Sequence, residues 1–450
     1  MEKVNELTEG NIFKSLIKFA LPVMLALFLQ ALYGAVDLFV VGKYAETPDI
    51  SGVATGSMVM HTVTTVITGL SMGITVLVGR RIGEKKADLA GKAIGAGIFL
   101  FCIMTVVLMV LVVIGAEALS TLMRAPAEAF EQTTAYIRIC GIGMLFIIAY
   151  NVLGSVFRGI GDSKTPLITV AVACTFNIVC DLLFVAVFEW GTAGAAWATV
   201  IAQAMSVLIS FVIIKRKQLP FKMSIKDIKF DKEIIAEEVR IGAPVALQDL
   251  LVGLSFLVIQ AIVNSIDVVA SAATGVGSKV CSFLMLVPSA YSMSMSAFVA
   301  QNLGAGTPKR AKKALYYGIA TSFVVGGLMA YLSIAHGDML ASIFDDDALV
   351  IKSAHDYLKT YGIDCLMTPF LFCFIGYYNG YGKTVFVMLQ GLIGAFCIRI
   401  PIAYLMSLRE GATLFDIGLA TPASTIVQII MCISVFMIMN KKMKENTNLA

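Results

Sequence analysis

Long apolar runs are the feature that most limits what this chain can fold into. The stretches from Ile94 to Ile114 and from Ile426 to Met439 are almost unbroken by polar residues. About 20 apolar residues span a bilayer as a helix, and in lipid every backbone polar group must be paired within the protein, which leaves helices or a closed barrel. Barrel strands alternate apolar and polar residues, and these runs do not alternate. We therefore predict an all-α integral membrane protein.

Composition supports this prediction, because only 14% of the 450 residues are charged, against about 25% in soluble domains. Charged or polar breaks divide the apolar sequence into twelve expected transmembrane helices. The expected spans are residues 13–41, 51–79, 93–115, 132–157, 165–188, 191–214, 236–265, 270–302, 313–335, 350–378, 384–407 and 415–440.

Most of the 34 lysines and arginines lie in every second connection between the spans. Cytoplasmic loops carry the excess of basic residues, so both termini are expected to be cytoplasmic and the chain to be a multi-pass protein of the plasma (inner) membrane. The basic stretch Lys215–Lys232 then lies inside, and the acidic stretch Asp345–Asp347 lies outside. The basic residues form no single stripe, so no nucleic-acid partner is expected.

The sequence contains an internal repeat. The segment Ala20–Val23 (ALPV) matches Gly242–Val245 (GAPV), and Arg158–Thr165 (RGIGDSKT) matches Asn379–Thr384 (NGYGKT). Matching positions are 219 to 222 residues apart, and each half has six expected spans, so the two six-helix repeats are parallel. Duplicated bundles of this kind build alternating-access carriers, although a bundle without moving parts is the alternative.

The repeat predicts three parts. They are an N-terminal six-helix lobe at residues 1–214, a cytoplasmic basic linker at 215–235 and a C-terminal six-helix lobe at 236–450.

Polar residues inside the first expected span are aligned on one helical face. Gln30, Tyr33 and Asp37 follow the spacing i, i+3, i+7, which places an amide, a phenol and a carboxylate along one side. Ionisable residues within a membrane are costly and are functional by default.

The fifth and sixth expected spans add Asn177, Asp181 and Thr199. Asn177 and Asp181 are one helical turn apart, so one ion could contact both. Together with Asp37 they offer hard oxygen ligands for a proton or sodium. The alternative is that Asp37 and Asp181 only bond neighbouring helices.

The second half differs from the first at these positions. The residue that matches Asp37 is Ile259, and the residue that matches Asp181 is Ile400, with Arg399 beside it. We therefore expect the cation site in the N-terminal half. Gln248 and Asp249 lie within the seventh span.

Gln248 and Asp249 are expected either to support the substrate cavity or, for Asp249, to pair with Lys279 or Arg399. Asp364, in the outer half of its span, is a weaker candidate.

Taken in order, these residues resemble the multidrug and toxic compound extrusion (MATE) family over about Asn11 to Asn440. The segments that carry the resemblance are Pro22, Gln30-x-x-Tyr33-x-x-x-Asp37, Val41-Gly42, Arg158-Gly-x-Gly-Asp-x-Lys-Thr-Pro166, Asn177-x-x-x-Asp181-x-x-Phe184, Gly194-Ala-Ala196, Thr199, Pro244 and Gln301-Asn302-x-Gly304.

The resemblance implies twelve helices in two lobes around a V-shaped cavity, and drug export driven by a proton or sodium gradient. It places the cation site at Asp37, Asn177, Asp181 and Thr199, with Gln30 and Tyr33 nearby. Some relatives use a glutamate in the seventh span and an aspartate in the tenth. Val252 stands where the glutamate would be, so a sodium site of that kind is not expected.

We predict a cation-coupled antiporter that exports small organic cations across the cell membrane. It is expected to be a monomer in contact with lipid, to use H⁺ or Na⁺ as the coupling ion, and to need no other cofactor or structural metal. No phosphate-binding loop or catalytic motif is present, so it is not expected to be an enzyme. The alternatives are a lipid-linked oligosaccharide flippase of the same superfamily and a channel.

Overall fold

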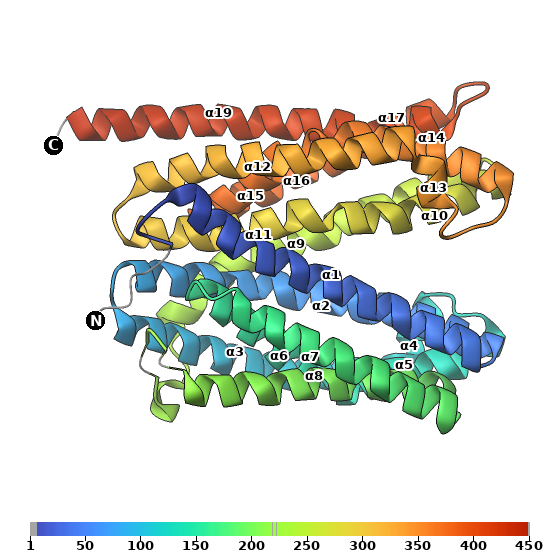
Figure 1. The fold of residues 1–450 in the computed structure, drawn as a ribbon, viewed down its shortest axis with the longest axis horizontal. Coiled ribbons are helices and arrows are strands. Elements are labelled where there is room, and N and C mark those ends of the chain that lie inside the picture. The colour runs from blue at the N-terminus through green and yellow to red at the C-terminus, as the bar shows by residue number, and fades with distance from the viewer. Residues whose placement is uncertain (1–6, 218, 222, 449–450) are drawn as a thin grey trace. The chain divides into compact units, whose positions relative to one another are not determined.

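The structure is a computed structural model that describes residues 7–217, 219–221 and 223–448. Within these residues the regular elements are all helical, and no strand occurs (Figure 1). The all-α prediction is therefore confirmed for the described part of the chain.

The first half of the chain forms eight α-helices, two 3₁₀ turns and one π-helical segment. They are α1 (Ile12–Tyr44), α2 (Thr47–Gly83), α3 (Ala87–Ile114), α4 (Ala116–Leu122), η1 (Ala127–Ala129), α5 (Phe130–Ile142), α6 (Met144–Gly159), α7 (Lys164–Asp181), η2 (Leu182–Val187), α8 (Gly191–Arg216) and η3 (Ile225–Asp227).

The second half forms eleven further α-helices and a second π-helical segment. They are α9 (Lys232–Asn264), α10 (Val268–Leu284), α11 (Leu286–Gly304), α12 (Pro308–Ala335), α13 (Gly337–Ala341), α14 (Ala348–Cys365), α15 (Thr368–Gly380), α16 (Thr384–Leu392), η4 (Ile393–Arg399), α17 (Ile400–Ser407), α18 (Leu414–Gly418) and α19 (Ala420–Asn448).

Short polar side chains at helix starts help to fix these boundaries. The Asn11 side chain accepts a hydrogen bond from the backbone N–H of Lys14 at 3.0 Å, and Asp347 accepts one from Leu349 at 2.8 Å. Each satisfies a backbone donor that the first turn of a helix leaves without a partner.

The predicted membrane spans are present. Among the described residues, 10 helical stretches are long and apolar enough to cross a membrane, and the number reaches 12 if each of two bent helix pairs counts as one span. The bent pairs are α5 with α6, at 58°, and α14 with α15, at 52°. They are the fourth spans of the two repeats, so the repeat includes this bend.

The two bends have different local causes. A Cβ atom at Gly143, between α5 and α6, would lie 2.4 Å from the side chain of Val200 on α8, so only glycine fits at this corner. Between α14 and α15 the break precedes Pro369, which lies in the first turn of α15. Proline lacks the N–H that would continue the preceding helix.

The fifth spans of both repeats also share a backbone feature. A π-helical segment follows Asp181 in the first repeat, and another ends at Arg399 in the second. Such wide turns are rare and occur often at functional sites. In each repeat the segment adjoins or includes a buried ionisable residue, Asp181 or Arg399.

The described chain forms two compact units. The first is the chain up to Ala246 together with Ala300–Pro308, and the second is Leu247–Val299 together with the chain from Lys309 onward. Each has its own buried apolar core. The first part of α9 and the last residues of α11 thus pack with the first unit, whereas the lobe boundaries proposed from the repeat lie at residues 214 and 236.

Glycines allow a close helix crossing at one end of the first unit. A Cβ atom at Gly83 of α2 would lie 2.0 Å from the carbonyl oxygen of Gln301, and one at Gly304 of α11 would lie 2.0 Å from that of Arg80. The two contacts correspond through the repeat, because Gly83 and Gly304, like Arg80 and Gln301, are 221 residues apart. Any larger residue would separate the backbones.

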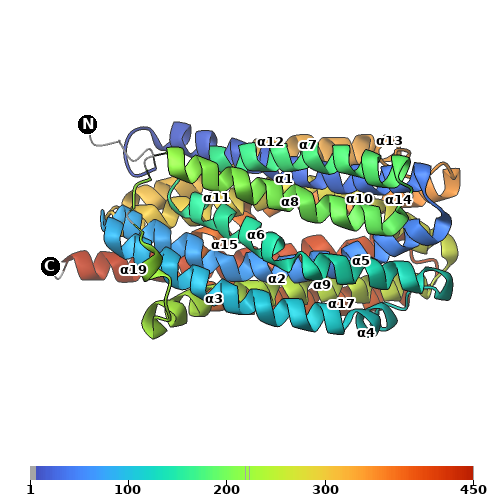
Figure 2. The same ribbon diagram turned by 90° about the horizontal axis from the view of Figure 1, so that it is seen from below.

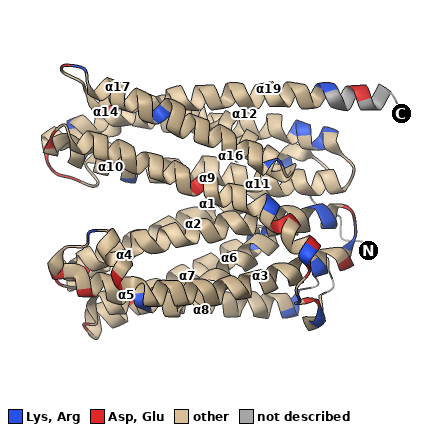
Figure 3. Cartoon of the chain, turned by 180° about the vertical axis from the view of Figure 1, so that it is seen from behind, with Lys and Arg blue, Asp and Glu red and all other residues tan. Residues whose placement is uncertain are grey.

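Lys and Arg gather at one end of each unit (Figure 3). In the first unit this end includes Arg80, Arg81 and Arg216, which close α2 and α8. In the second unit, Lys312 lies near the start of α12 and Lys383 directly precedes α16. This distribution matches the alternation on which the topology prediction depends.

Candidate functional site

Asp37 lies on α1, in the first unit, and only 5% of its surface is exposed. Helix α1 packs along α7, and α7 packs along α8 (Figure 2). The packing of α1 against α7 turns the carboxyl group of Asp37 toward that of Asp181. The two groups interact electrostatically, although no hydrogen bond of good geometry joins them.

Asn177 and Asp181 are fully buried one turn apart on α7. Both carboxylate oxygens of Asp181, both amide atoms of Asn177 and Oδ1 of Asp37 lack hydrogen-bond partners among the described residues. Buried polar atoms are nearly always paired, so this group of atoms is a candidate binding site. The structure therefore brings together three of the four residues expected to bind the cation.

Thr199, the fourth, is half-buried on α8. Its hydroxyl group lies near the phenol of Tyr136 on α5, which also interacts with Asp37 and Cys140. Tyr136 and Cys140 are almost completely buried. Thr199 thus joins the site through Tyr136.

The other two aligned residues of α1 have partners of their own. Gln30 donates a hydrogen bond from Nε2 to Oη of Tyr150 on α6, at 2.7 Å. Tyr33 lies beside Gln203 of α8 and interacts electrostatically with Asp37. We conclude that Tyr33 borders the carboxyl site and that Gln30 connects α1 to α6 about two turns away.

Two adjacent carboxylates in a buried site cannot both stay ionised unless a cation joins them. The site therefore needs at least one proton or one metal cation. Carboxylate, amide and hydroxyl oxygens suit either. Among the described residues no group of three or more His, Cys, Asp or Glu side chains could hold a metal, so any metal here would depend on Asn177 and Thr199 as well.

In the second unit, Gln248 and Asp249 are neighbours on α9 with opposite exposure. Gln248 is buried against Gly391, whereas Asp249 is exposed. The alternative that Asp249 pairs with Lys279 or Arg399 is not found, because no ion pair joins these described residues.

Lys279 and Arg399 lie over aromatic rings. Lys279 Nζ is 5.8 Å from the centre of the Phe344 ring, and the Arg399 guanidinium is 4.4 Å from that of Phe256. Arg399 also donates a hydrogen bond from Nη1 to Oγ of Ser255 at 3.2 Å. Lys279 is exposed, whereas Arg399 is a buried cation that these contacts help to stabilise.

Asp364 is also buried in the second unit, and it interacts with Arg399 and Thr425. Its Oδ1 lacks a hydrogen-bond partner among the described residues. The second unit therefore pairs a buried acid with a buried base, whereas the first unit places two buried acids next to each other.

Sequence reasoning missed Tyr136, Cys140 and Gln203. Tyr136 and Cys140 are one turn apart in the fourth span, so their spacing could have suggested a shared face. It gave no sign that this face meets Asp37, because that contact depends on how separate helices pack together.

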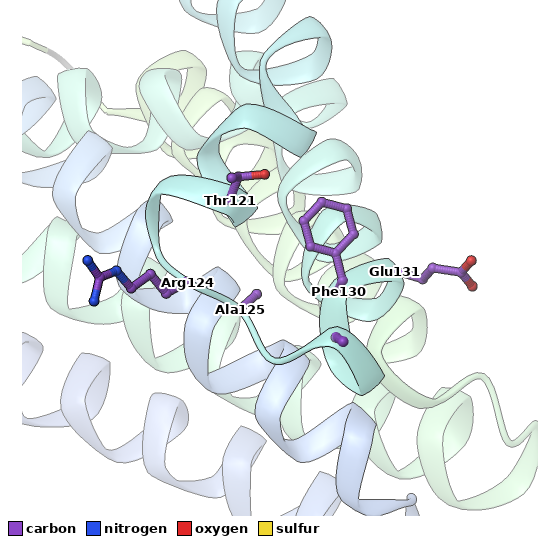
Figure 4. A pocket seen from close by; sticks show the side chains of 6 residues that line it. Thr121, Arg124, Ala125, Phe130 and Glu131 are labelled. Atoms are coloured by element: carbon purple, nitrogen blue, oxygen red, sulfur yellow. The ribbon is translucent and has the colours of Figure 1, made fainter.

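One surface hollow is lined by the connection between α4 and α5 (Figure 4). Figure 4 shows Arg124 and Glu131 pointing away from each other on its two sides. It contains none of the residues discussed above, so the buried acids remain the candidate site.

Comparison with known proteins supports the same two repeats. The MatE family model matches residues 22–183 and 244–405, and the two matches are 222 residues apart at both ends. This agrees with the repeat offset in the sequence.

The chain is 27% identical to the "Probable multidrug resistance protein YpnP" of Bacillus subtilis (strain 168), over 93% of each chain. It is 23% identical to the "Multidrug export protein MepA" of Staphylococcus saprophyticus, over 92% of this chain and 91% of that protein. Among solved structures, "Crystal structure of MATE in complex with MaL6" superposes with a TM-score of 0.92 at 18% identity, over 99% of this chain and 100% of the other. This last similarity shows a shared fold.

Proposed function

The chain belongs to the MatE family of membrane transporters, and we propose that it exports small organic cations in exchange for protons or sodium ions. The observation that carries the proposal is the buried group formed by Asp37, Asn177 and Asp181, in which Oδ1 of each residue and Oδ2 of Asp181 lack hydrogen-bond partners among the described residues. Export of drugs is further supported by the names of its relatives, a multidrug resistance protein and a multidrug export protein.

Exchange follows from the cost of leaving the acids charged and empty. When the coupling ion leaves, Asp37 and Asp181 repel each other in a low dielectric. A cationic substrate lowers that cost, as does the next proton or sodium ion. Each ligand then favours the conformation to which it binds more tightly, which couples outward movement of the drug to inward movement of the ion.

The remaining predicted residues have supporting roles in this proposal. Thr199 and Tyr33 would complete the ion site, and Gln30 would hold α1 against α6. Asp249 is an exposed carboxyl group on an apolar span, and a charge facing lipid is costly. We therefore assign Asp249 to a wetted surface that attracts cationic substrates, and Gln248, which is buried against Gly391, to the support of that part of α9.

The proposed orientation has both termini and the stretch Lys215–Lys232 in the cytoplasm of a cell whose plasma membrane holds the protein. The gathering of basic residues at one end of each unit supports it. An engineered cysteine in this stretch should react with a membrane-impermeant reagent only after the membrane is opened.

The decisive experiment uses the variant Asp181→Asn in proteoliposomes, with proton and sodium gradients imposed separately and ethidium as a fluorescent organic cation. Wild type should move ethidium in response to one of the gradients. Asp181→Asn resembles a permanently protonated site, so it should fold and insert but no longer respond to either gradient.

A matched control is Asp162→Asn, which removes a carboxyl group from the loop between α6 and α7 and should keep gradient-driven transport. If Asp181→Asn still transports ethidium in response to a gradient, Asp181 has a structural role and the proposal is wrong.

A further inference from the structure

Glu238 is a third buried acid of the first unit, far along the chain from Asp37 and Asp181. It lies in the first part of α9, and only 1% of its surface is exposed. Neither of its carboxylate oxygens has a hydrogen-bond partner among the described residues. Since buried polar atoms are rarely left unpaired, this carboxyl group requires an explanation.

Glycines of two other helices create the space that Glu238 occupies. A Cβ atom at Gly73 of α2 would lie 2.2 Å from the carbonyl oxygen of Glu238, and one at Gly97 of α3 would lie 3.2 Å from its Oε1. The side chain of Ile74 lies next to Gly97. The backbone of α9 therefore rests on α2, and the carboxyl group enters an apolar slot between α2 and α3.

The same face of α9 stays close to α2 over further turns. Cβ atoms at Gly242 and at Gly69 would lie 2.2 Å from the Leu70 carbonyl oxygen and 2.5 Å from Ala246 Cα, respectively. Contacts this close leave no room for a water layer. The slot is dry as long as this part of α9 remains in place.

Nearby charges do not stabilise an ionised Glu238. Arg80 and Arg81 of α2 pair with the adjacent Glu237, at 3.5 and 3.6 Å. Lys92 of α3 is exposed, Asp227 of η3 packs against Gly95 through its backbone, and Arg240 is exposed on α9. Among the described residues the only charge that acts appreciably on Glu238 is Glu237, which has the same sign.

We propose that Glu238 is a second proton-binding site, which holds a proton while the first part of α9 lies on α2 and α3 and releases it when that part moves away. A neutral carboxyl group is far cheaper to bury than a carboxylate. A proton fits better than a metal ion, because among the described residues Glu238 belongs to no group of three or more His, Cys, Asp or Glu side chains that could hold a metal. Proton binding at Glu238 therefore stabilises the seated position of α9.

Infrared spectroscopy tests the protonation directly. In reconstituted wild-type protein at neutral pH, the spectrum should contain the carbonyl stretch of a protonated carboxyl group that is absent from Glu238→Gln. The neighbouring variant Glu237→Gln is the matched control and should keep this band. If Glu238→Gln and wild type have the same carboxyl bands, Glu238 is ionised and the proposal is wrong.

Hydrogen–deuterium exchange tests the link to α9. After correction for the intrinsic rate, the peptide covering residues 232–246 in wild type and in Glu237→Gln should lose protection as the pH rises, while peptides from α12 do not. In Glu238→Gln the protection should not depend on pH. An equal pH dependence in all three proteins, or none in wild type, would overturn the proposal. Asp181→Asn should still show this pH dependence, because it leaves Glu238 unchanged. The experiment can therefore contradict the Glu238 proposal without bearing on the proposed exchange site.

Discussion

The fifth span of the first half and its counterpart in the second half share a backbone plan but carry opposite charges. Both contain a π-helical segment. The first places Asp181 against the acid of α1, whereas the second places Arg399 over Phe256 and against Ser255 of α9. The difference indicates that the two halves kept the same backbone geometry after duplication, while the charged residues beside the π-helical segment diverged. Only the first half would then bind the cation.

The largest expected effect comes from neutralising one buried acid of each half in turn. Asp37→Asn should reduce gradient-driven ethidium export to the rate of liposomes without protein, because it removes one of the two carboxyl groups that a cation can join. Asp364→Asn should keep gradient dependence, because Arg399 already compensates this acid. Transport by both variants in proteoliposomes measures the contrast, and wild-type coupling in Asp37→Asn would contradict it.

Removing the base of the second half should affect stability more than coupling. Arg399→Ala loses the contacts to Phe256 and Ser255 and leaves Asp364 uncompensated, so we expect a loss of about 3 kcal/mol. Thermal unfolding in detergent measures this loss, and Arg399→Lys, which keeps the charge, should recover part of it. An unchanged melting temperature in Arg399→Ala would show that the guanidinium does not stabilise the second unit.

The glycine crossing is a place where the two halves should behave alike. Gly83→Ala and Gly304→Ala each place a Cβ atom 2.0 Å from a backbone oxygen, so each should destabilise the protein by a similar amount, about 2 kcal/mol. Gly34→Ala on α1 is the control, because nothing lies within 4 Å of its added Cβ atom. A large difference between Gly83→Ala and Gly304→Ala in thermal unfolding would contradict the interpretation that the two glycine contacts are equivalent.

The smallest expected effect concerns the loop between α6 and α7. Burial raises the pKa of Asp162, but the ion pair with Lys217 and hydrogen bonds from Thr165 outweigh it and hold the pKa below its usual value. The ion pair therefore stabilises the fold above about pH 4, and the contribution is lost as the pH falls through the folded-state pKa.

Lys217 is partly exposed, so this contribution should stay below about 1 kcal/mol. Asp162→Asn should remove that part of the acid dependence of thermal unfolding. The matching turn of the second half, around Lys383, contains no acid, so no equivalent effect is expected there. Identical acid profiles of wild type and Asp162→Asn would contradict the assignment.

The sequence predicted most of the fold because apolar runs and basic breaks are local signals. All twelve spans could be located, and the repeat was visible in short matching segments. The bend at Gly143 was not predicted, since it depends on the fit of that glycine against Val200 of another helix.

The candidate site was predicted only in part, because local sequence signals locate its residues but do not show contacts between helices. Asp37, Asn177 and Asp181 stand out as polar residues in apolar spans, and their helical spacing predicted which of them share a face. Tyr136 and Glu238 were missed because their significance comes from contacts between helices. Glu238 also looks like an ordinary interfacial charge in sequence, because it follows Glu237 and lies two residues before Arg240.

The crossing of Gly83 and Gly304 also bears on how such a chain could arise. Gly83 contacts the backbone of Gln301, and Gly304 contacts the backbone of Arg80, which is the residue that corresponds to Gln301 in the first repeat. Reciprocal contacts of this kind are the pattern of a two-fold interface between identical surfaces. A single six-helix ancestor with this glycine could therefore have paired with a second copy of itself in parallel orientation. Fusion of two such genes would preserve the contact unchanged and leave the buried sites of the two copies free to diverge.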